Sequence, residues 1–459
     1  MTILDKAQAI DVAEQARRHL LPHFTKGRAW TSDDLGVMDR GEGCYVYDTA
    51  GVEYLDGLAG LFCTNLGHGR KDLAAAASAQ MEKLAFYPTW GWANEPAARA
   101  AAMIAERAPG DLSEVFFVSS GSEAVESMLK LARCYHLGQG DDQRFKVISR
   151  DWAYHGTTLG ALSVTSIPKL REPYAPMLWD GTHKVPNTYG DTADELASAK
   201  AVEDMILAEG PETVAAVVCE PVQNGRGGLV PPDGYWQALR EICDQYGVLL
   251  VADEIICGFG RFGYWFASER FGVTPDIITF AKGVTSAYQP LGGMVIREPL
   301  VESIWESAMG AYLHGATFGG HPVATAVAVA TMNAMEDENI NDHVLANESG
   351  LRARMDDLME RHNIISEVRG LGYFYALELV ADREDGRPLS ETQRSALEGG
   401  KLSQFLREAR VLIRPDDRGA TMLTVSPPLI ADDGVLDDLT DRLDKVLSMT
   451  ESWLVDNPA

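Results

Sequence analysis

The stretches VLLVADEIICGFGRFG (248–263) and PDIITFAKGV (275–284) decide the fold of this chain. Each contains a short apolar run that is rich in β-branched residues. Runs that are apolar on both faces are typical of strands in a parallel sheet that helices cover. Open sheets of this kind bind ligands beyond the carboxyl ends of their strands. Asp253 and Lys282 stand at the ends of these two runs and are therefore placed to meet a ligand.

The same alternation of apolar runs and helical patterns extends from about residue 60 to 300. It predicts an α/β fold with a large, doubly wound, mainly parallel sheet. The helices between the runs have start signals, such as Asn94 with Pro96 and Ser122 with Glu123. The six expected strands are EVFFV (114–118), KVIS (146–149), VAAVVC (214–219), VLLVAD (248–253), IITF (277–280) and GMVI (293–296).

The C-terminal part has a different character, which predicts a smaller α+β unit. The hairpin-like CYVYDTAGVEYLDG (44–57) lies in a segment too short to be a domain, and we expect that segment to pack with the C-terminal unit. We therefore expect an N-terminal segment at 1–58, a large ligand-binding domain at 59–330 and a small domain at 331–459. The expected C-terminal elements are charged helices around 335–362, 390–410 and 431–450 and strands at 373–380, 411–414 and 422–426.

Composition narrows the class of protein. With 459 residues, 46% hydrophobic and 23% charged, the chain is typical of folded globular proteins. Its formal net charge of −27 would repel a nucleic acid backbone or an anionic membrane, so neither is an expected partner. No apolar run approaches the roughly 18 residues of a membrane-spanning helix.

The cysteines and the first residues indicate a compartment. The six cysteines are scattered without a C-x-x-C spacing, so we expect buried thiols in a reducing compartment and no metal site. Residues 1–20 have an amphipathic rhythm with charges throughout and lack the apolar core of a signal peptide. Both observations lead us to expect a cytoplasmic protein.

The run SSGSE (119–123) follows the expected strand at 114–118 and opens a helix. A glycine lets backbone N–H groups approach a ligand, and a helix N-terminus with serine hydroxyls favours an anion such as phosphate. An ordinary N-cap explains the same residues about equally well. The lysine spacing of a P-loop is absent.

Three further features lie at strand ends. A strand-end aspartate, a lone lysine and the run Tyr154-His155-Gly156 each have an ordinary structural interpretation. Together with the serine-glycine helix start they supply what pyridoxal 5'-phosphate requires: a phosphate cradle, a carboxylate (Asp253) for the ring nitrogen and a lysine (Lys282) for the aldehyde. Tyr154 could provide an aromatic face against the ring.

The sequence resembles the class III aminotransferases, which belong to the fold-type I pyridoxal phosphate enzymes, and most closely their ω-amino acid and amine:pyruvate members. The likeness extends over nearly the whole chain, from the hairpin at 44–57 to VSPPL (425–429). The matching motifs, in the order of the family, are SGSEAVES (120–127), YHG (154–156), DEIICGFGRFG (253–263), PDIITFAKGV (275–284), PLGGMVI (290–296) and TFGGHPVA (317–324).

The resemblance implies a role for each residue of the cofactor site. Lys282 would bind the cofactor covalently and move a proton at the substrate carbon, while Asp253 would pair with the ring nitrogen. Tyr154 and Ile255 would lie against the two faces of the ring. The remaining cofactor-binding residues it implies are Ser120, Gly121, Ser122, His155, Glu220 and Thr317.

Two of these assignments have further consequences. Thr317 matches a threonine that reaches the phosphate from a neighbouring subunit, so we expect a homodimer or a tetramer of dimers with shared active sites. Glu220 in CEPVQ (219–223) matches a glutamate under the cofactor, although a structural hydrogen bond explains a strand-end acid nearly as well.

Substrate binding is expected from Arg414, Phe62, Trp90 and Tyr154. Arg414 matches an arginine that binds a substrate carboxylate, and its planar fork suits that group, although Arg418 leaves the alignment uncertain by a loop. Phe62 stands where many amine transaminases carry a tryptophan, and Tyr154 and Trp90 add aromatic walls.

Position 225 separates the subgroups of the family. Ornithine and 4-aminobutyrate aminotransferases carry a glutamate there that pairs with the substrate-binding arginine, and this chain has Gly225. We therefore expect Arg414 to lack a carboxylate partner and to swing away when a substrate without a carboxylate enters.

The expected function is transfer of an amino group from an ω-amino acid or primary amine to a 2-oxo acid, with pyruvate the first choice, by a ping-pong mechanism. An aminomutase and a dialkylglycine-type decarboxylase share the fold and stay open as alternatives, as does a non-catalytic cofactor-binding homologue. A Rossmann dehydrogenase is excluded because no G-x-G-x-x-G joins a strand to a helix with an acid about 20 residues further on.

Overall fold

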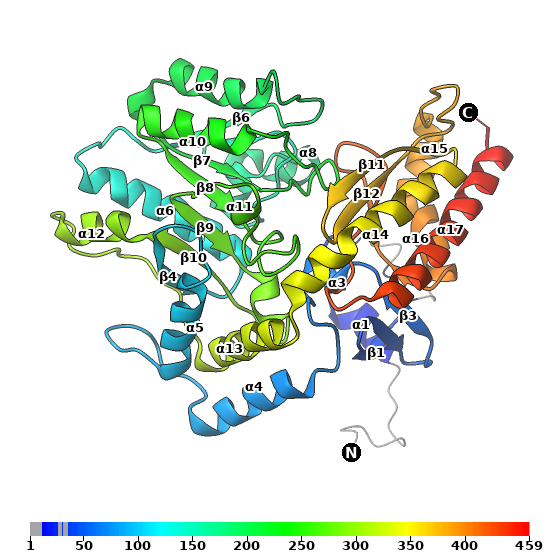
Figure 1. Cartoon of the computed structure of the whole chain (residues 1–459), viewed down its shortest axis with the longest axis horizontal. Coiled ribbons are helices and arrows are strands. Elements are labelled where there is room, and N and C mark those ends of the chain that lie inside the picture. The colour runs from blue at the N-terminus through cyan, green and yellow to red at the C-terminus, as the bar shows by residue number, and fades with distance from the viewer. Residues whose placement is uncertain (1–11, 26–29, 31–34, 459) are drawn as a thin grey trace.

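The computed structural model of the chain describes residues 12–25, 30 and 35–458 (Figure 1). A seven-stranded sheet forms the centre of its larger part, and β10 alone in this sheet runs antiparallel to its neighbours. The strands, in their spatial order, are β4 (Leu112–Val118), β10 (Gly292–Arg297), β9 (Ile277–Phe280), β8 (Leu249–Asp253), β7 (Val214–Cys219), β5 (Lys146–Arg150) and β6 (Thr182–Val185). The predicted α/β class with a large, mainly parallel sheet is confirmed.

All six expected strands of this sheet are present, with ends within two residues of those predicted. The sequence analysis missed β6, THKV, because this strand lies at the edge of the sheet and three of its four residues are only half-buried. A strand of this kind carries too few apolar residues to be recognised from its pattern.

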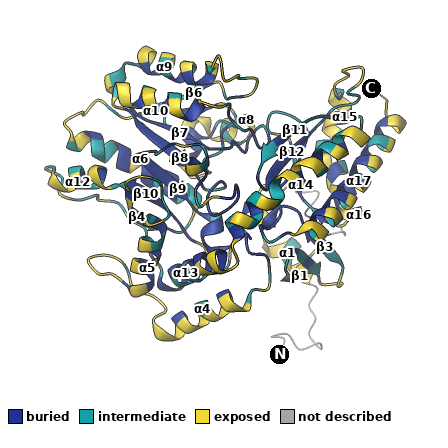
Figure 2. Ribbon diagram, viewed as in Figure 1, coloured by how far each residue is buried: buried dark blue, intermediate teal, exposed yellow. Residues whose placement is uncertain are grey.

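Helices cover both faces of the sheet. Neighbouring strand residues such as Leu250 and Val251 point to opposite sides and join two separate apolar cores. Figure 2 shows the strands almost entirely buried, while the helices around them expose their outer faces. The helices of this part are α3 (Ala59–Phe62), α4 (Lys71–Lys83), α5 (Glu95–Ala105), α6 (Gly121–Gly138), α7 (Leu159–Val164), α8 (Pro168–Arg171), α9 (Ala197–Glu209), α10 (Tyr235–Tyr246), α11 (Ala267–Arg270), α12 (Glu298–Glu306) and α13 (Pro322–Asp337), with the 3-10 turns η2 (Glu172–Met177), η3 (Pro211–Thr213) and η4 (Lys282–Thr285).

The helix start signals are borne out with one correction. Asn94 caps α5 by accepting a hydrogen bond from the backbone of Ala97 at 3.0 Å. The cap of α6 is Ser120 rather than Ser122, because the helix already begins at the intervening glycine. Ser122 therefore lies in the first turn, where its backbone N–H has no partner within the helix.

The smaller part contains two four-stranded sheets. Strand β13 pairs in parallel with β3, so the N-terminal hairpin and the C-terminal chain share one sheet. The first sheet, in order, is β1 (Met38–Glu42), β2 (Tyr45–Asp48), β3 (Glu53–Asp56) and β13 (Val411–Leu412), and the second is β11 (Ile365–Leu371), β12 (Phe374–Leu379), β15 (Met422–Val425) and β14 (Arg414–Asp416). The other elements are α1 (Val12–His19), α14 (Ile340–Arg361), α15 (Glu391–Ala396), η5 (Leu397–Lys401), α16 (Leu402–Glu408) and α17 (Asp433–Asp456). This pairing suits the expected organisation, whose domain boundaries stay a prediction.

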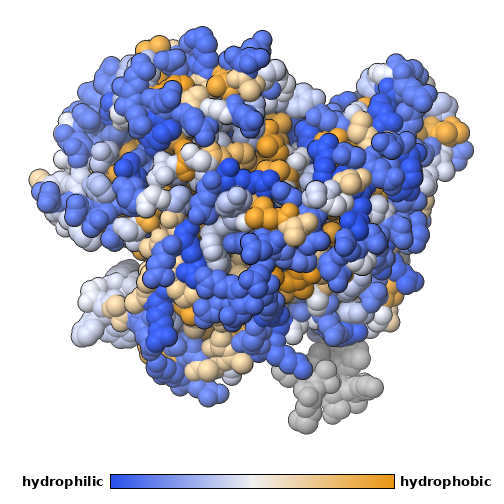
Figure 3. Space-filling view, in the orientation of Figure 1, coloured by the Kyte–Doolittle hydropathy of each residue, from blue (hydrophilic) through white to orange (hydrophobic). Residues whose placement is uncertain are grey.

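The face shown in Figure 3 is mostly hydrophilic, and apolar side chains come to the surface mainly in its middle. Within residues 12–25, 30 and 35–458, no helix is long and apolar enough to cross a membrane. All six cysteines are free, but Cys63 and Cys134 are only half-buried, which corrects the expectation that every thiol is buried.

Candidate active site

The carboxyl ends of five strands meet at one edge of the large sheet. Strands β5, β7, β8 and β9 are parallel, and β4 has the same direction because it pairs with the antiparallel β10. Residues that are far apart in sequence therefore converge where these strands end. Eleven of the thirteen predicted site residues line one cavity there, of about 620 Å³: Phe62, Ser120, Gly121, Ser122, Tyr154, His155, Glu220, Asp253, Ile255, Lys282 and Arg414.

Asp253, the last residue of β8, is held by three hydrogen-bond partners. Its Oδ2 lies 2.6 Å from Nδ1 of His155, and its Oδ1 accepts hydrogen bonds from the hydroxyl of Thr279 at 3.1 Å and the backbone of Ile255 at 3.2 Å. Only 3% of the residue is exposed. The carboxylate is therefore buried in one fixed orientation, with His155 behind it.

Lys282 begins the turn η4 just after β9. Its φ of 47° lies in the left-handed region, where residues other than glycine are uncommon. Such strain concentrates at functional positions. Burial lowers the pKa of the Lys282 amine, although the carboxylate of Asp253 opposes the shift. A larger fraction of this amine is therefore neutral than on a solvated lysine, and a neutral amine can act as a nucleophile or a base.

The first turn of α6 forms a cradle with the turn at Gly156. The hydroxyl of Ser122 accepts a hydrogen bond from the backbone of Thr157 at 3.1 Å. A Cβ on Gly156 would lie 2.4 Å from that hydroxyl, and a Cβ on Gly121 would lie 2.9 Å from the side chain of Ile255. Gly156, whose φ is 125°, packs closely against Ser122, and Gly121 packs against Ile255. The N-terminus of α6 lines the cavity through Ser120, Gly121 and Ser122 and can bind an anion there.

Glu220 joins two loops of the site. Its Oε1 accepts a hydrogen bond from the backbone of Tyr154 at 2.9 Å, and its Oε2 accepts one from the backbone of Asn224 at 2.7 Å. Burial raises the pKa of this carboxyl group, although His155 opposes the shift. The structural role considered for Glu220 is thus observed, and its contact with a cofactor stays a prediction.

Arg414 has a carboxylate partner, contrary to expectation. Its Nη2 lies 2.7 Å from Oδ2 of Asp416 and donates a hydrogen bond to Oδ1 of Asn224 at 2.8 Å. Residues two apart on a strand point to the same side, so β14 presents Arg414 and Asp416 together. The expectation that Arg414 is unpaired is therefore wrong, because it considered only position 225.

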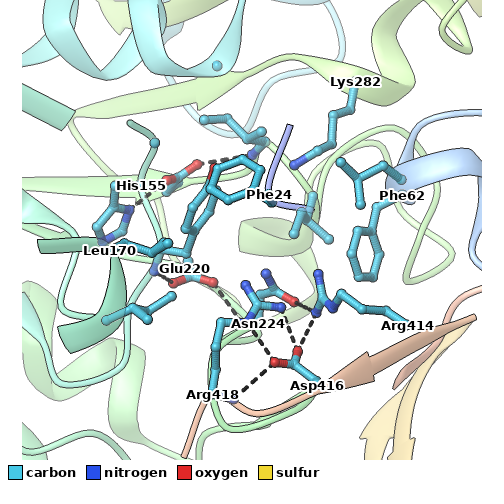
Figure 4. A pocket seen from close by; sticks show the side chains of 18 of the residues that line it. Phe24, Phe62, His155, Leu170, Glu220, Asn224, Lys282, Arg414, Asp416 and Arg418 are labelled. Carbon is cyan, nitrogen blue, oxygen red and sulfur yellow. Dashed lines mark hydrogen bonds and ion pairs between the residues drawn. The ribbon is translucent and has the colours of Figure 1, made fainter. Parts of the chain in front are cut away.

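Arg418 binds the same carboxylate from the other side. Its Nε donates to Oδ1 of Asp416 at 2.8 Å and its Nη2 donates to Oδ2 at 2.5 Å. Burial disfavours a charged carboxylate, but the two guanidinium groups outweigh it and lower the pKa of Asp416 to about 2. Figure 4 shows Arg414, Asn224 and Arg418 around this one carboxylate. The sequence left open whether Arg414 or Arg418 matches the carboxylate-binding arginine, and the structure places both beside Asp416.

Glycine at position 225 is a steric requirement. A Cβ built on Gly225 would lie 1.8 Å from the carbonyl oxygen of Trp152. Trp152 itself has a φ of 64°, so the turn that carries this carbonyl is also in the left-handed region. No side chain fits at position 225 while that turn keeps its conformation.

Several residues of the cavity wall were missed by sequence reasoning. Asn224 and Asp416 lie close to Arg414 and were not named in the sequence analysis, and the i+2 spacing on a strand was the one available signal for Asp416. The outer part of the wall has no such signal, because it depends on loops and helices from distant parts of the chain. It includes Phe24, Ile167, Lys169, Leu170, Glu398, Leu402 and Asp417.

Trp90 and Thr317 are the two predicted residues that do not line the cavity. Both are exposed to solvent, and the indole nitrogen of Trp90 lies 3.7 Å from where a Cβ on Gly315 would be. Residues 86–92 and 317–318, which contain Trp90 and Thr317, expose four more aromatic side chains: Phe86, Tyr87, Trp92 and Phe318. The rings of Phe86 and Phe318 are in edge-to-face contact, with their centroids 5.6 Å apart. We call these six residues the aromatic face.

Comparison with known proteins decides the family. The sequence model described as aminotransferase class-III matches residues 29–447. The chain belongs to the class III aminotransferases. It is 42% identical over 447 residues to a probable aminotransferase of Mycobacterium tuberculosis, covering 96% of this chain and 95% of the relative. It is 36% identical to the putrescine–pyruvate aminotransferase of Pseudomonas aeruginosa, covering 95% of each chain.

Solved structures agree with this assignment. The aminotransferase superposes with a TM-score of 0.91 on an (S)-enantioselective ω-transaminase from Thermomicrobium roseum, with 36% identity over 96% of this chain and 99% of that one. It also matches the ω-transaminase from Pseudomonas jessenii in complex with PMP, with a TM-score of 0.91 and 32% identity over 97% and 100% of the chains. The fold is that of the fold-type I transaminases.

Class III aminotransferases use pyridoxal 5'-phosphate, and the cavity of this aminotransferase fits that group. Its wall combines the N-terminus of α6, a buried carboxylate and a lysine with a lowered pKa. These are the three kinds of group that a phosphorylated pyridine aldehyde needs.

Proposed function

We propose that this aminotransferase uses pyridoxal 5'-phosphate to move an amino group from an ω-amino acid or primary amine to pyruvate, by a ping-pong mechanism. One observation carries the proposal: a lysine, a buried aspartate and a helix N-terminus line a single cavity together with an arginine that can read a carboxylate. The relatives named for putrescine and for ω-transaminase activity support the choice of donor and acceptor.

The protein would hold the cofactor at three points. Ser120, Gly121 and Ser122 would bind the phosphate through the first turn of α6, where backbone N–H groups and the helix dipole favour an anion. Asp253 would pair with the protonated ring nitrogen, and His155 and Thr279 hold its carboxylate in place. Tyr154 and Ile255 would enclose the ring from its two faces.

When bound, the cofactor supplies an electron sink for negative charge on the substrate carbon. Lys282 would attach to the cofactor aldehyde in the resting enzyme. Once released by the incoming amine, its free amine would take the proton from the substrate carbon and deliver it to the carbon of the cofactor that carried the aldehyde, and the reverse transfer would serve the second half-reaction. A neutral amine is needed for that step, and the lowered pKa of Lys282 favours one.

The remaining wall suits a substrate that is partly apolar. Phe62 is buried, with φ at 60°, and its ring centroid lies 5.1 Å from Cζ of Arg414. An apolar amine would contact this ring, whereas the carboxylate of pyruvate or alanine would reach Arg414. The site thus offers both kinds of contact that a dual-specificity aminotransferase requires.

We also propose that two chains form the working enzyme, as a homodimer or a tetramer of dimers. The aromatic face exposes five aromatic side chains, and exposed apolar patches mark interaction surfaces. It contains Thr317, whose expected role is to reach the phosphate in the partner's cavity. Trp90 would then contribute to a substrate wall that is shared between subunits.

Alanine formation tests the reaction. Purified enzyme loaded with pyridoxal 5'-phosphate is incubated with pyruvate and, separately, taurine, β-alanine, putrescine and 1-phenylethylamine. We expect alanine with at least one donor. Rearrangement of the donor without pyruvate would indicate an aminomutase, and carbon dioxide release from dialkylglycine would indicate a decarboxylase. Cofactor binding without any turnover would indicate the non-catalytic homologue.

Sedimentation tests the two-chain site. We expect activity to follow the dimer or a larger assembly as the protein is diluted. Thr317→Ala is expected to weaken cofactor binding without dissociating the chains, because it removes one hydroxyl from a large apolar contact. A fully active monomer would refute the shared site.

A further inference from the structure

Arg414, Asp416, Arg418 and Asn224 form a polar cluster on the β14 side of the cavity, which we call the arginine cluster. Only 2% of the Asp416 side chain is exposed, against 21% for Arg414 and 14% for Arg418. The carboxylate is thus more deeply buried than either guanidinium group. A buried carboxylate is tolerated when ion pairs and hydrogen bonds satisfy it, and Asp416 has both.

The two arginines of this cluster are not equivalent. Arg418 donates hydrogen bonds from Nε and Nη2 to the two carboxylate oxygens of Asp416, and its backbone N–H donates to Oδ1 at 3.1 Å. The Nε and Nη2 edge of the Arg418 guanidinium is therefore occupied by Asp416. Arg414 contributes one nitrogen, Nη2. Its Nε is buried and has no hydrogen-bond partner among the described residues. Arg414, which lines the cavity with 21% of its side chain exposed, is therefore held less fully by Asp416 than Arg418 is.

The arginine cluster has a net positive charge of one. Two guanidinium groups surround one carboxylate, while Asn224 contributes a neutral acceptor. A substrate carboxylate would balance this charge. A substrate without a carboxylate would leave Arg414 with a partner, because Asp416 remains.

We propose that Asp416 is a resident counter-ion that keeps Arg414 in the cavity with either kind of substrate and sets how tightly a substrate carboxylate binds. The proposal rests on the proposed function, since it concerns the two substrates of that reaction. It replaces a swinging arginine with a fixed one. Dual specificity then follows from an internal carboxylate that partly satisfies Arg414, which disfavours carboxylate ligands relative to an unopposed arginine pair.

Propanoate is the probe for this proposal, because it carries the carboxylate of alanine but has neither an amino nor an oxo group to react. Its dissociation constant is measured by calorimetry on the holoenzyme and on Asp416→Asn, which keeps the shape of the side chain and removes its charge. We expect binding to the variant to be about tenfold tighter, since one negative charge beside the ligand is gone. The KM for pyruvate should fall in parallel, and the KM for 1-phenylethylamine should change less than twofold.

Two further variants separate charge from disruption. Asp416→Asn combined with Arg418→Gln restores the net positive charge of one, so propanoate affinity should return to within about threefold of the wild type. Asp276→Asn is the matched control. Asp276 is also buried between two arginines, Arg240 and Arg297, at 2.9 and 3.2 Å, but at the opposite end of the sheet from Lys282. It should leave propanoate binding unchanged while lowering stability.

Unchanged or weaker propanoate binding in Asp416→Asn would overturn the proposal and leave Asp416 a purely structural partner of the arginines. A double variant that binds propanoate as tightly as the single one would also overturn it, because affinity would then not follow charge. Failure of the proposed function has a different signature, namely wild-type enzyme that makes no alanine from pyruvate. Propanoate binding is measured without turnover, so the two failures are distinguishable.

Discussion

The two sides of the cavity carry opposite charge patterns. At the sheet edge, the carboxyl groups of Asp253 and Glu220 face the amine of Lys282. Across the cavity, two guanidinium groups surround the single carboxylate of Asp416. The sheet-edge groups follow the ends of parallel strands, whereas the three charged residues of the arginine cluster lie on a three-residue strand and the loop after it. We infer that the sheet edge performs the chemistry and the arginine cluster selects what reaches it.

Replacement of Lys282 should cause the largest loss. Lys282→Ala removes both the group that attaches to the cofactor and the base, so turnover should fall by roughly 10⁴-fold or more. The phosphate and ring contacts remain, and the variant should still bind the cofactor. Absorbance of the wild type should show a covalent link that borohydride fixes on Lys282. Lys200→Ala, an exposed lysine paired with Asp204, is the control. Normal turnover by Lys282→Ala would remove the catalytic assignment.

Asp253→Asn should have the next largest effect, on the order of 100-fold in turnover. A neutral amide cannot keep the ring nitrogen protonated, so the electron sink weakens although the shape is preserved. Because the Asp253 carboxylate raises the pKa of Lys282, its removal should lower that pKa further. The rate at which apo-enzyme bonds covalently to the cofactor should then reach its plateau at a lower pH than in the wild type. A shift toward higher pH would contradict the proposed proximity of these charges.

Arg414→Ala should damage one half-reaction only. Charge-assisted hydrogen bonds are worth about 1.5–3 kcal/mol each, so the reaction with pyruvate should slow by about tenfold to a thousandfold. The reaction with 1-phenylethylamine should barely change. Single-turnover absorbance follows each half separately. Equal damage to both halves would show that Arg414 is structural and would erase the contrast between the two sides of the cavity.

The smallest expected effect concerns acid stability. The arginines hold the pKa of Asp416 at about 2, below the unfolded value of 3.8, so its charged form stabilises the folded chain above about pH 4. That contribution, roughly 2 kcal/mol, is lost as the pH falls from about 4 to 2. The free energy of unfolding, measured with a denaturant at several pH values across this range, should decrease less steeply on acidification in Asp416→Asn than in the wild type. Parallel curves would show that Asp416 is not selectively stabilised as the anion.

Local patterns explain why the sheet edge could be predicted. Each residue there follows an apolar run, and the end of a strand fixes where the next side chain lies. Asp253 and Lys282 needed only two such runs and the rule that parallel strands end at one edge. The family resemblance then added their roles. Ser120 and Gly121 follow the same logic, because they join a strand to a helix.

The arginine cluster could not be predicted in the same way. Strand β14 is too short to show a period, and its pairing with β15 decides which side chains face the cavity. Strand β11 was missed for a related reason: it contains Glu367 and Arg369, and Arg369 is satisfied by Glu378 of β12 at 2.7 Å. Polar residues with partners across a sheet do not look like a strand in the sequence alone.

The contact between Gly225 and Trp152 limits how this enzyme can change by mutation. A glutamate at position 225 would need the Trp152 carbonyl to move, since even a single carbon there approaches it to 1.8 Å. A one-step mutational route to the arrangement of the 4-aminobutyrate enzymes is therefore closed. Evolution or an engineer would have to rebuild the turn at Trp152 first, and any library that varies position 225 alone should return glycine.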